Sequence, residues 1–156
     1  MKLVVAAVGR IKPGPEATLV DDYVKRFDGA GRSIGLGPLS VEEVDARGKG
    51  QSEESALLAA RIAPDDHVVI LDERGKSLPS EKFSQLICDW RDDGVRCARF
   101  LIGGADGHTH ELRQRANMMI SFGSATWPHM MVRAMLTEQL YRAAAIATGH
   151  PYHRGG

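Results

Sequence analysis

The sequence predicts an α/β fold in which a mostly parallel sheet is flanked by helices. Short apolar runs rich in β-branched residues alternate along the chain with longer segments of helical periodicity, which is typical of parallel strands joined by helical crossovers. The chain has 156 residues, the size of one domain, and it contains no internal repeat or low-complexity segment. We therefore expect one domain spanning residues 1–156.

The first half of the chain contains two predicted strands and two predicted helices. The apolar run 3–9 is a predicted buried strand, and residues 16–27 place an apolar side chain at every fourth position, as on one helical face. The glycine-rich stretch 29–38 is a predicted loose connection to a strand over 39–44. A serine followed by two glutamates suits a helix N-terminus and begins the predicted helix 52–62.

The second half continues the alternation of strands and helices. Its clearest strand is 67–72, which contains four consecutive apolar residues and ends in the turn-rich stretch 73–76. Ser80 is expected to cap the next helix, which extends to Trp90. The shorter elements that follow are a strand over 99–102, a helix over 111–116 and a strand over 118–122.

A long predicted helix over 130–148 carries only three formal charges, on Arg133, Glu138 and Arg142. Gly149 follows as its C-terminal stop. Because apolar residues cover most of this helix, we expect a second surface, such as a partner subunit, to cover what one sheet cannot. Glu138 and Arg142 have i, i+4 spacing, which fits either a helix salt bridge or a functional pair of buried charges.

The charge of the chain is balanced overall but divided along its length. Twenty basic and twenty acidic residues give a formal net charge of zero, which excludes a protein that coats nucleic acid by bulk charge and favours self-association. From residue 128 onward three arginines face one glutamate. The neutral total therefore conceals a basic C-terminal end.

Cysteine usage and hydropathy exclude several classes of protein. Cys88 and Cys97 have neither CxxC nor zinc-site spacing, so we expect both to be reduced and buried. The run 3–9 is followed at once by Arg10 and Lys12 without a cleavage site, and no window approaches the roughly 18–20 apolar residues of a membrane span. We expect a cytoplasmic protein with no membrane association and no metal.

Two predicted loops follow strand ends, where open parallel sheets bind their ligands. One follows Leu71 and the other follows Ile102. The second contains Gly103, Gly104 and Gly107, which fits a ligand loop or a plain turn equally well, because it is not a dinucleotide fingerprint. A doubly wound methyltransferase would carry its glycine-rich loop after the first strand instead.

A metal hydrolase is a weaker alternative. His108 and His110 are the one close pair of histidines before the tail, whereas a hydrolytic metal site needs more clustered ligands. A His-x-His pair in a glycine-rich loop is expected to lie in solvent.

The tail concentrates aromatic and titratable groups. His150, Pro151, Tyr152, His153 and Arg154 place two imidazoles, a phenol and a guanidinium within five residues. Such groups can stack on a base, contact phosphate or move a proton near neutral pH. We therefore expect the tail to contribute to function.

These motifs together resemble the RlmH family of SPOUT-class methyltransferases. The segments that resemble it most are 101–107, the Pro128-His129 step, 132–143 and 150–154, and the likeness extends over residues 1–154. The resemblance implies a C-terminal deep trefoil knot, a homodimer and S-adenosylmethionine held in the knot. It also implies methylation at N3 of a pseudouridine in 23S rRNA within the assembled ribosome.

The resemblance further implies positions for cofactor and chemistry. The cofactor-binding positions are Leu71, Gly103, Gly104, Gly123, Ser124, Ala125, Thr126, Trp127 and Pro128, of which Trp127 is bulkier than the aliphatic residue expected there. The hypothesis for the chemistry is that His129 or His153 removes the N3 proton while Arg133, Arg142 or Arg154 stabilises charge and phosphate. His129 is equally consistent with a structural role, as a residue at a helix start whose side chain forms hydrogen bonds only to the backbone.

Other predictions concern RNA. Tyr152 is expected to stack on a base, and the loop residues Arg47, Lys49, Arg74 and Lys76 are either RNA contacts or solvated charges. The alternative function is a non-catalytic ribosome- or RNA-binding α/β module, which would share the basic end but need no glycine turn.

Overall fold

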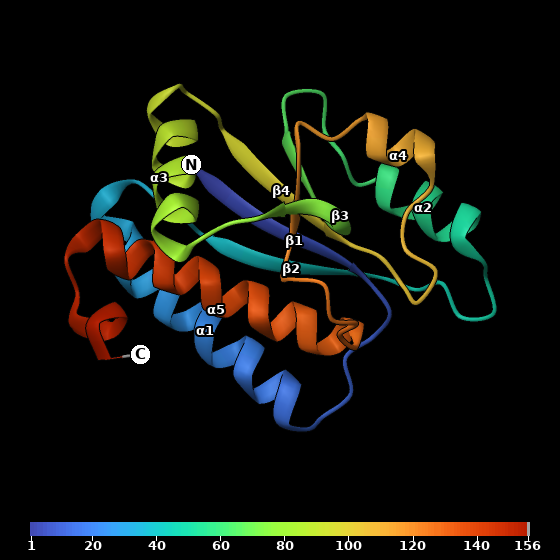
Figure 1. Cartoon of the computed structure of the whole chain (residues 1–156), viewed down its shortest axis with the longest axis horizontal. Coiled ribbons are helices and arrows are strands. Elements are labelled where there is room, and N and C mark those ends of the chain that lie inside the picture. Colours follow the sequence, from blue (N-terminus) through green and yellow to red (C-terminus); the bar gives the residue numbers. More distant parts are fainter. Residues whose placement is uncertain (156) are drawn as a thin grey trace.

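Five strands form one parallel sheet in the computed structural model, which describes residues 1–155 (Figure 1). The strand order is β2-β1-β4-β3-β5, and all four pairings are parallel. The strands are β1 (Lys2–Val8), β2 (Leu39–Val44), β3 (His67–Ser77), β4 (Cys97–Ile102) and β5 (Met118–Ser121). The predicted parallel sheet is confirmed, and the knot stays a prediction.

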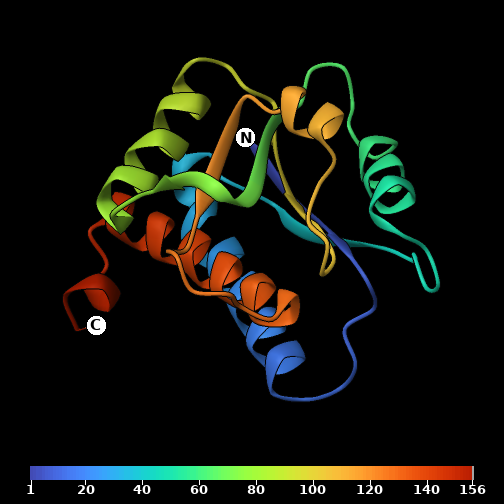
Figure 2. The ribbon, with the colours of Figure 1, turned by 45° about the vertical axis from the view of Figure 1, so that its right-hand side comes forward.

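Helices cover both faces of the sheet (Figures 1 and 2). One face packs against α1 (Pro15–Gly31), α3 (Ser80–Asp92) and α5 (His129–Thr148). The other face packs against α2 (Gln51–Ala59) and the short α4 (His110–Gln114). Two 3-10 turns complete the chain, η1 (Arg32–Ile34) and η2 (Pro151–Gly155).

Each central strand contributes to two separate cores. Val5 and Ala7 of β1 belong to the larger cluster with the side chains of α1, α3 and α5, whereas Ala6 and Val8 belong to the cluster under α2 and α4. Successive side chains of a strand point to opposite faces, so a strand buried on both faces is a continuous apolar run. This explains why 3–9 was recognisable as a strand.

The prediction that β3 ends in a turn at 73–76 is wrong. Pairing with β5 shifts register after Leu71 and resumes at Lys76 opposite Ile120, so β3 extends to Ser77. Gly75 makes this possible, because a Cβ there would lie 2.5 Å from the backbone nitrogen of Ile120. The turn-rich composition reflects a bulged strand rather than a chain reversal.

Other boundaries also differ from the predictions. The stretch predicted to be loose is helical through Gly31 and continues into η1, and the helix predicted to reach residue 62 ends at Ala59. Ser80 does not cap α3; its hydroxyl donates to Oε1 of Gln139 at 2.8 Å. The C-terminal stop is confirmed, since Gly149 adopts the left-handed conformation with φ 71°.

The predictions for the cysteines and the tail also need correction. Cys88 and Cys97 are free but only half-buried. Residues 151–155 of the tail form η2 against α5, and Gly156 lies outside the described residues. Within residues 1–155, no helix is long and apolar enough to cross a membrane.

Candidate functional site

A cavity of about 560 Å³ opens at the carboxyl ends of β3, β4 and β5. We call it the strand-end cavity; its walls are Leu71–Arg74, the glycine turn Gly104–His108 and the segment from Ile120 to Trp127. Clefts of about 300–1,000 Å³ at this edge of an open α/β sheet are common sites for small ligands. The glycine turn and the stretch after Leu71, which is a bulged part of β3 rather than the predicted loop, therefore border one cavity.

Most of the predicted cofactor positions line this cavity. Leu71, Gly104, Gly123, Ala125, Thr126 and Trp127 belong to the lining residues. Gly103, Ser124 and Pro128 do not. Trp127 is 44 % exposed and donates its indole N–H to the carbonyl of Phe122, so the bulky ring lies at the rim.

The first two glycines of the turn, Gly103 and Gly104, have no room for side chains. A Cβ on Gly103 would lie 3.1 Å from Cε1 of His108, and one on Gly104 would lie 2.6 Å from Oε2 of Glu54. The turn closes through a hydrogen bond from the amide of Gly107 to the carbonyl of Gly104 at 3.1 Å. Such close approach of backbone to its surroundings is what a ligand-binding glycine loop requires.

Helices α2 and α4 hold the same turn from the side away from the sheet. Gln51 donates to the carbonyls of Asp106 at 2.7 Å and His108 at 3.2 Å. Arg113 donates to the His108 carbonyl at 2.5 Å, and the amide of Thr109 donates to the hydroxyl of Ser55. Sequence reasoning missed Gln51 and Ser55, because no local pattern connects α2 with a loop more than fifty residues later. It also missed Arg113, although this residue is only five positions from His108.

His108 is buried, contrary to the expectation that the His-x-His pair lies in solvent. It is 1 % exposed, whereas His110 is exposed. Burial lowers the pKa of His108, and the charge of Asp72 opposes this effect. Within the described chain, no three His, Cys, Asp or Glu side chains are grouped to hold a metal ion.

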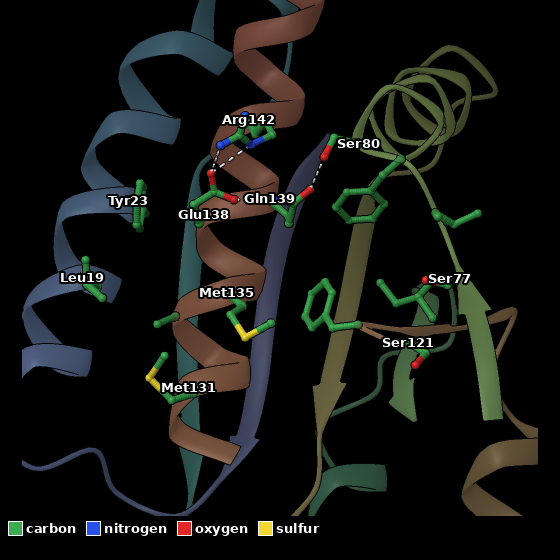
Figure 3. Close-up of a pocket in the computed structure, with 15 residues that line it drawn as sticks. Leu19, Tyr23, Ser77, Ser80, Ser121, Met131, Met135, Glu138, Gln139 and Arg142 are labelled. Atoms are coloured by element: carbon green, nitrogen blue, oxygen red, sulfur yellow. Dashed lines mark hydrogen bonds and ion pairs between the residues drawn. The ribbon is translucent and has the colours of Figure 1, made fainter. Parts of the chain in front are cut away.

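A second group of polar side chains lies where η2 folds back on α5 and α3. We call it the C-terminal cluster; it consists of Glu81, Glu138, Arg142, Tyr152 and His153. Arg142 donates to Oε1 of Glu138 at 2.6 and 2.9 Å (Figure 3), and the Tyr152 hydroxyl donates to the same oxygen at 2.9 Å. Nε2 of His153 lies 2.9 Å from Oε1 of Glu81, and its Nδ1 lies 3.3 Å from Arg142.

The surroundings of Arg142 and Tyr152 raise the pKa of both groups. Burial is the largest cause that raises the pKa of Tyr152, followed by hydrogen bonds to Tyr23 and Glu138. The hydrogen bond to Glu138 also raises the pKa of Arg142. Glu138 and Arg142 therefore form a half-buried ion pair that also holds the tail.

A groove of about 500 Å³ separates α1 and α5 from the ends of β3 and β5 (Figure 3). Its lining is mainly apolar, with Leu19 of α1 and Met131 and Met135 of α5, and it reaches Glu138 and Arg142. We call it the α1–α5 groove. The segment 120–122 lines both this groove and the strand-end cavity, so the two hollows share a wall.

The structure separates the predicted chemical groups within one chain. His129 is the first residue of α5, Glu138 lies near its middle and Arg142 lies in its second half. The thirteen residues from His129 to Arg142 span about 20 Å of helix. No residue of the C-terminal cluster lines the strand-end cavity, so the tail does not border the predicted cofactor positions within a single chain.

Arg133 is buried completely. Its guanidinium forms an ion pair with Glu43 at 2.9 Å and donates to the carbonyls of Val8 at 3.2 Å and Gly9 at 2.9 Å. In this chain it has no exposed surface with which to contact a phosphate, which corrects the predicted role. By contrast, Arg154 is exposed.

Of the predicted RNA contacts, only Arg74 borders the strand-end cavity. It is paired with Asp72 at 3.3 Å. Arg47 is paired with Asp45 at 2.7 Å, and Lys49 and Lys76 are exposed. Their contact with RNA stays a prediction.

Comparison with known proteins identifies close sequence relatives. Residues 1–153 match the family described as "Predicted SPOUT methyltransferase". The chain is similar to proteins named "Ribosomal RNA large subunit methyltransferase H" from Maricaulis maris, with 54% identity over 99% of each chain, and from Nitrobacter winogradskyi, with 53% identity over 99% of this chain and 100% of that protein.

A solved structure with a looser likeness is the SpoU methyltransferase AviRb from Streptomyces viridochromogenes, crystallised with AdoMet. It aligns at a TM-score of 0.39 and 15% identity, and covers 94% of this chain and 57% of that one.

Proposed function

The chain belongs to the SPOUT methyltransferase family, and from this membership we propose that it methylates ribosomal RNA of the large ribosomal subunit with S-adenosylmethionine as donor. The observation that carries the proposal is 54% identity, over nearly the whole of both chains, to a protein named for that activity. The proposed target is N3 of a pseudouridine in 23S rRNA of the assembled ribosome, and the proposed location is the cytoplasm.

The strand-end cavity fits the proposed cofactor in size and charge. Its volume of about 560 Å³ suits a ligand of this class, and the glycine turn brings backbone close to the cavity. The lining carries the carboxylates of Asp72, Glu73 and Asp106 beside the guanidinium groups of Arg74 and Arg113. Mixed charge suits a ligand that carries a sulfonium, an ammonium and a carboxylate.

The proposed division of work follows from these groups. When bound, S-adenosylmethionine supplies a methyl group on a sulfonium. Leu71, Gly104 and the segment 123–127 hold it and exclude water, so that the acceptor meets it in line.

N3 of the acceptor must lose a proton, and the C-terminal cluster has the groups for this step. The Nε2–H of His153 donates to Glu81 at 2.9 Å, so Nδ1 is the nitrogen that would take the N3 proton, with the substrate replacing the 3.3 Å contact between Nδ1 and Arg142. Arg142 stabilises negative charge beside it. His129 is the second candidate base; it is half-buried at the start of α5.

A homodimer would bring the two parts of the site together. No residue of the C-terminal cluster lines the strand-end cavity of its own chain. Leu19 in the α1–α5 groove is 40% exposed, and Met131 and Met135 are half-buried. We therefore place a second copy of the chain in this groove, related by a two-fold axis, with its tail directed to the strand-end cavity.

Transfer of tritium from labelled S-adenosylmethionine tests the proposal. Intact ribosomes, separated subunits and naked 23S rRNA serve as acceptors, and the modified base is then mapped. We expect label in intact ribosomes, at N3 of a single pseudouridine. Absence of label in every acceptor would overturn the enzymatic proposal.

Calorimetry with S-adenosylmethionine separates this proposal from the alternative of a non-catalytic ribosome- or RNA-binding module. Such a module would bind ribosomes but give no heat when titrated with S-adenosylmethionine. The methyltransferase should bind the cofactor, and give heat, in the absence of RNA.

A further inference from the structure

His108 joins the ends of two neighbouring strands at the strand-end cavity. Its Nε2 lies 3.2 Å from the carbonyl oxygen of Leu71, the residue at which the β3–β5 register shifts. Its Cε1 faces Gly103, the first residue after β4, so closely that a Cβ there would lie 3.1 Å away. The ring therefore touches both stretches that the sequence singled out as ligand loops.

The hydrogen bond determines the state of the ring. A carbonyl oxygen can only accept, so Nε2 must carry the proton and donate it. Nδ1 is then the unprotonated nitrogen of the neutral ring, and it is buried without a partner. Burial also lowers the pKa of His108, which keeps the ring neutral near pH 7.

A buried polar side chain with one unpaired nitrogen lowers the stability of a core in which an apolar side chain could stand instead. The contacts of His108 with Leu71 and Gly103 offset this loss of stability. Pairing of β3 with β4 ends at Leu71, so the carbonyl of Leu71 needs another donor, and the imidazole supplies that donor while it sets the spacing between β3 and the glycine turn.

We propose that His108 is a positioning residue for the cofactor, which holds the Leu71 carbonyl and the glycine turn at the separation that S-adenosylmethionine binding requires. The proposal rests on the proposed function, because it assigns the cavity to that cofactor. His108 acts through the backbone that it holds rather than by contact with the reacting atoms.

Substitutions that differ in reach test the hydrogen bond. The amide of Gln places its N–H near the position of Nε2, whereas the shorter Asn does not reach Leu71 and Leu has no donor. We expect His108→Leu and His108→Asn to raise the Kd for S-adenosylmethionine, measured by calorimetry, about tenfold, the effect of one lost hydrogen bond. His108→Gln should remain within about threefold of the unaltered protein.

Kinetics and a matched control separate positioning from general damage. With ribosomes as acceptor, the KM for S-adenosylmethionine should rise with the Kd in His108→Leu, while kcat at saturation changes less than about twofold. The control is His67→Leu, which removes a half-buried imidazole from the opposite end of β3, where it packs on Trp90. Its Kd should equal that of the unaltered protein.

Three outcomes would overturn the assignment. These are unchanged cofactor affinity in both His108→Leu and His108→Asn, equal losses in His108→Asn and His108→Gln, or an equal loss in His67→Leu. If the unaltered protein gave no heat with S-adenosylmethionine, the proposed function itself would fail, and the assignment of His108 with it. Normal binding by every variant would remove only the role of His108.

Discussion

The strand-end cavity and the C-terminal cluster differ in the groups that form them. At the cavity the backbone predominates: Gly103 and Gly104 have no room for side chains, and Gln51 and Arg113 donate to backbone carbonyls. A buried neutral imidazole also donates to a carbonyl there. The C-terminal cluster is made of charged and titratable side chains, with two carboxylates, a guanidinium, a phenol and an imidazole. One region can hold a donor, and the other can move a proton.

On the proposed function, neither region by itself is a complete site for methyl transfer. No residue of the C-terminal cluster lines the strand-end cavity of the same chain, although the α1–α5 groove and the cavity share the wall 120–122. Completion by a second copy is the simplest way to bring the donor and the base together, because a two-fold axis gives each cavity a tail from the other chain.

Mixed dimers give the largest expected effect. Gly103→Val should distort the glycine turn, since its Cβ would lie 3.1 Å from His108 and 3.2 Å from the Gly107 carbonyl. The second variant lacks residues 150–156 and therefore has no tail. Each variant alone is expected to transfer no methyl group. After subunit exchange, random pairing makes half of the dimers mixed with one intact site each, so about a quarter of full activity should return.

The tritium assay measures this recovery, and calorimetry provides its control. The tail-deleted protein must bind S-adenosylmethionine with unaltered affinity, because its cavity is intact. No recovery in mixtures that have exchanged subunits would show that cavity and tail act within one chain, and the dimeric arrangement would be wrong.

A smaller effect concerns Arg133, which belongs to neither region. Arg133→Met removes the partner of Glu43 and the donors to the carbonyls of Val8 and Gly9. The buried carbonyl of Val8 and the half-buried carbonyl of Gly9 then lose this donor, so the free energy of unfolding should fall by about 2–4 kcal/mol. Urea denaturation measures this loss.

Arg154→Met is the matched control, because Arg154 is exposed. It should leave unfolding within about 0.5 kcal/mol and change only transfer activity. If Arg133→Met kept full stability but lost activity, Arg133 would act on substrate, as the sequence hypothesis had it.

The smallest expected effect is a dependence of stability on pH. Burial lowers the pKa of His108 at the cavity and of His67 at the opposite end of β3. The unfolded chain therefore binds more protons than the folded one as pH falls below about 6.5, and the free energy of unfolding falls with it until the folded histidines protonate in turn.

Urea denaturation between about pH 5 and about pH 8 follows this change. His67→Leu and His108→Gln should each flatten the profile, because neither replacement titrates in this range. A profile that is unchanged in both variants would assign the pH dependence to other groups.

The two regions also differ in how well the sequence predicted them. Leu71, Gly104 and the segment 123–127 were placed by strand-end logic and by resemblance, and most of them line one cavity. The tail was predicted to be functional, and this stays a prediction. Its docking on Glu81 and Glu138 was not predicted, because contacts between residues 14 and 72 positions apart leave no local pattern.

By itself, the sequence determined the alternating elements, the parallel sheet, the stop at Gly149 and the glycine turn that follows β4. Each depends on periodicity or on backbone freedom within a few residues. Only the tertiary structure decided that β3 continues past Gly75, that Arg133 is buried and that His108 holds Leu71. These outcomes depend on contacts between residues 37 to 125 positions apart, where packing and the need to pair buried polar groups override local preference.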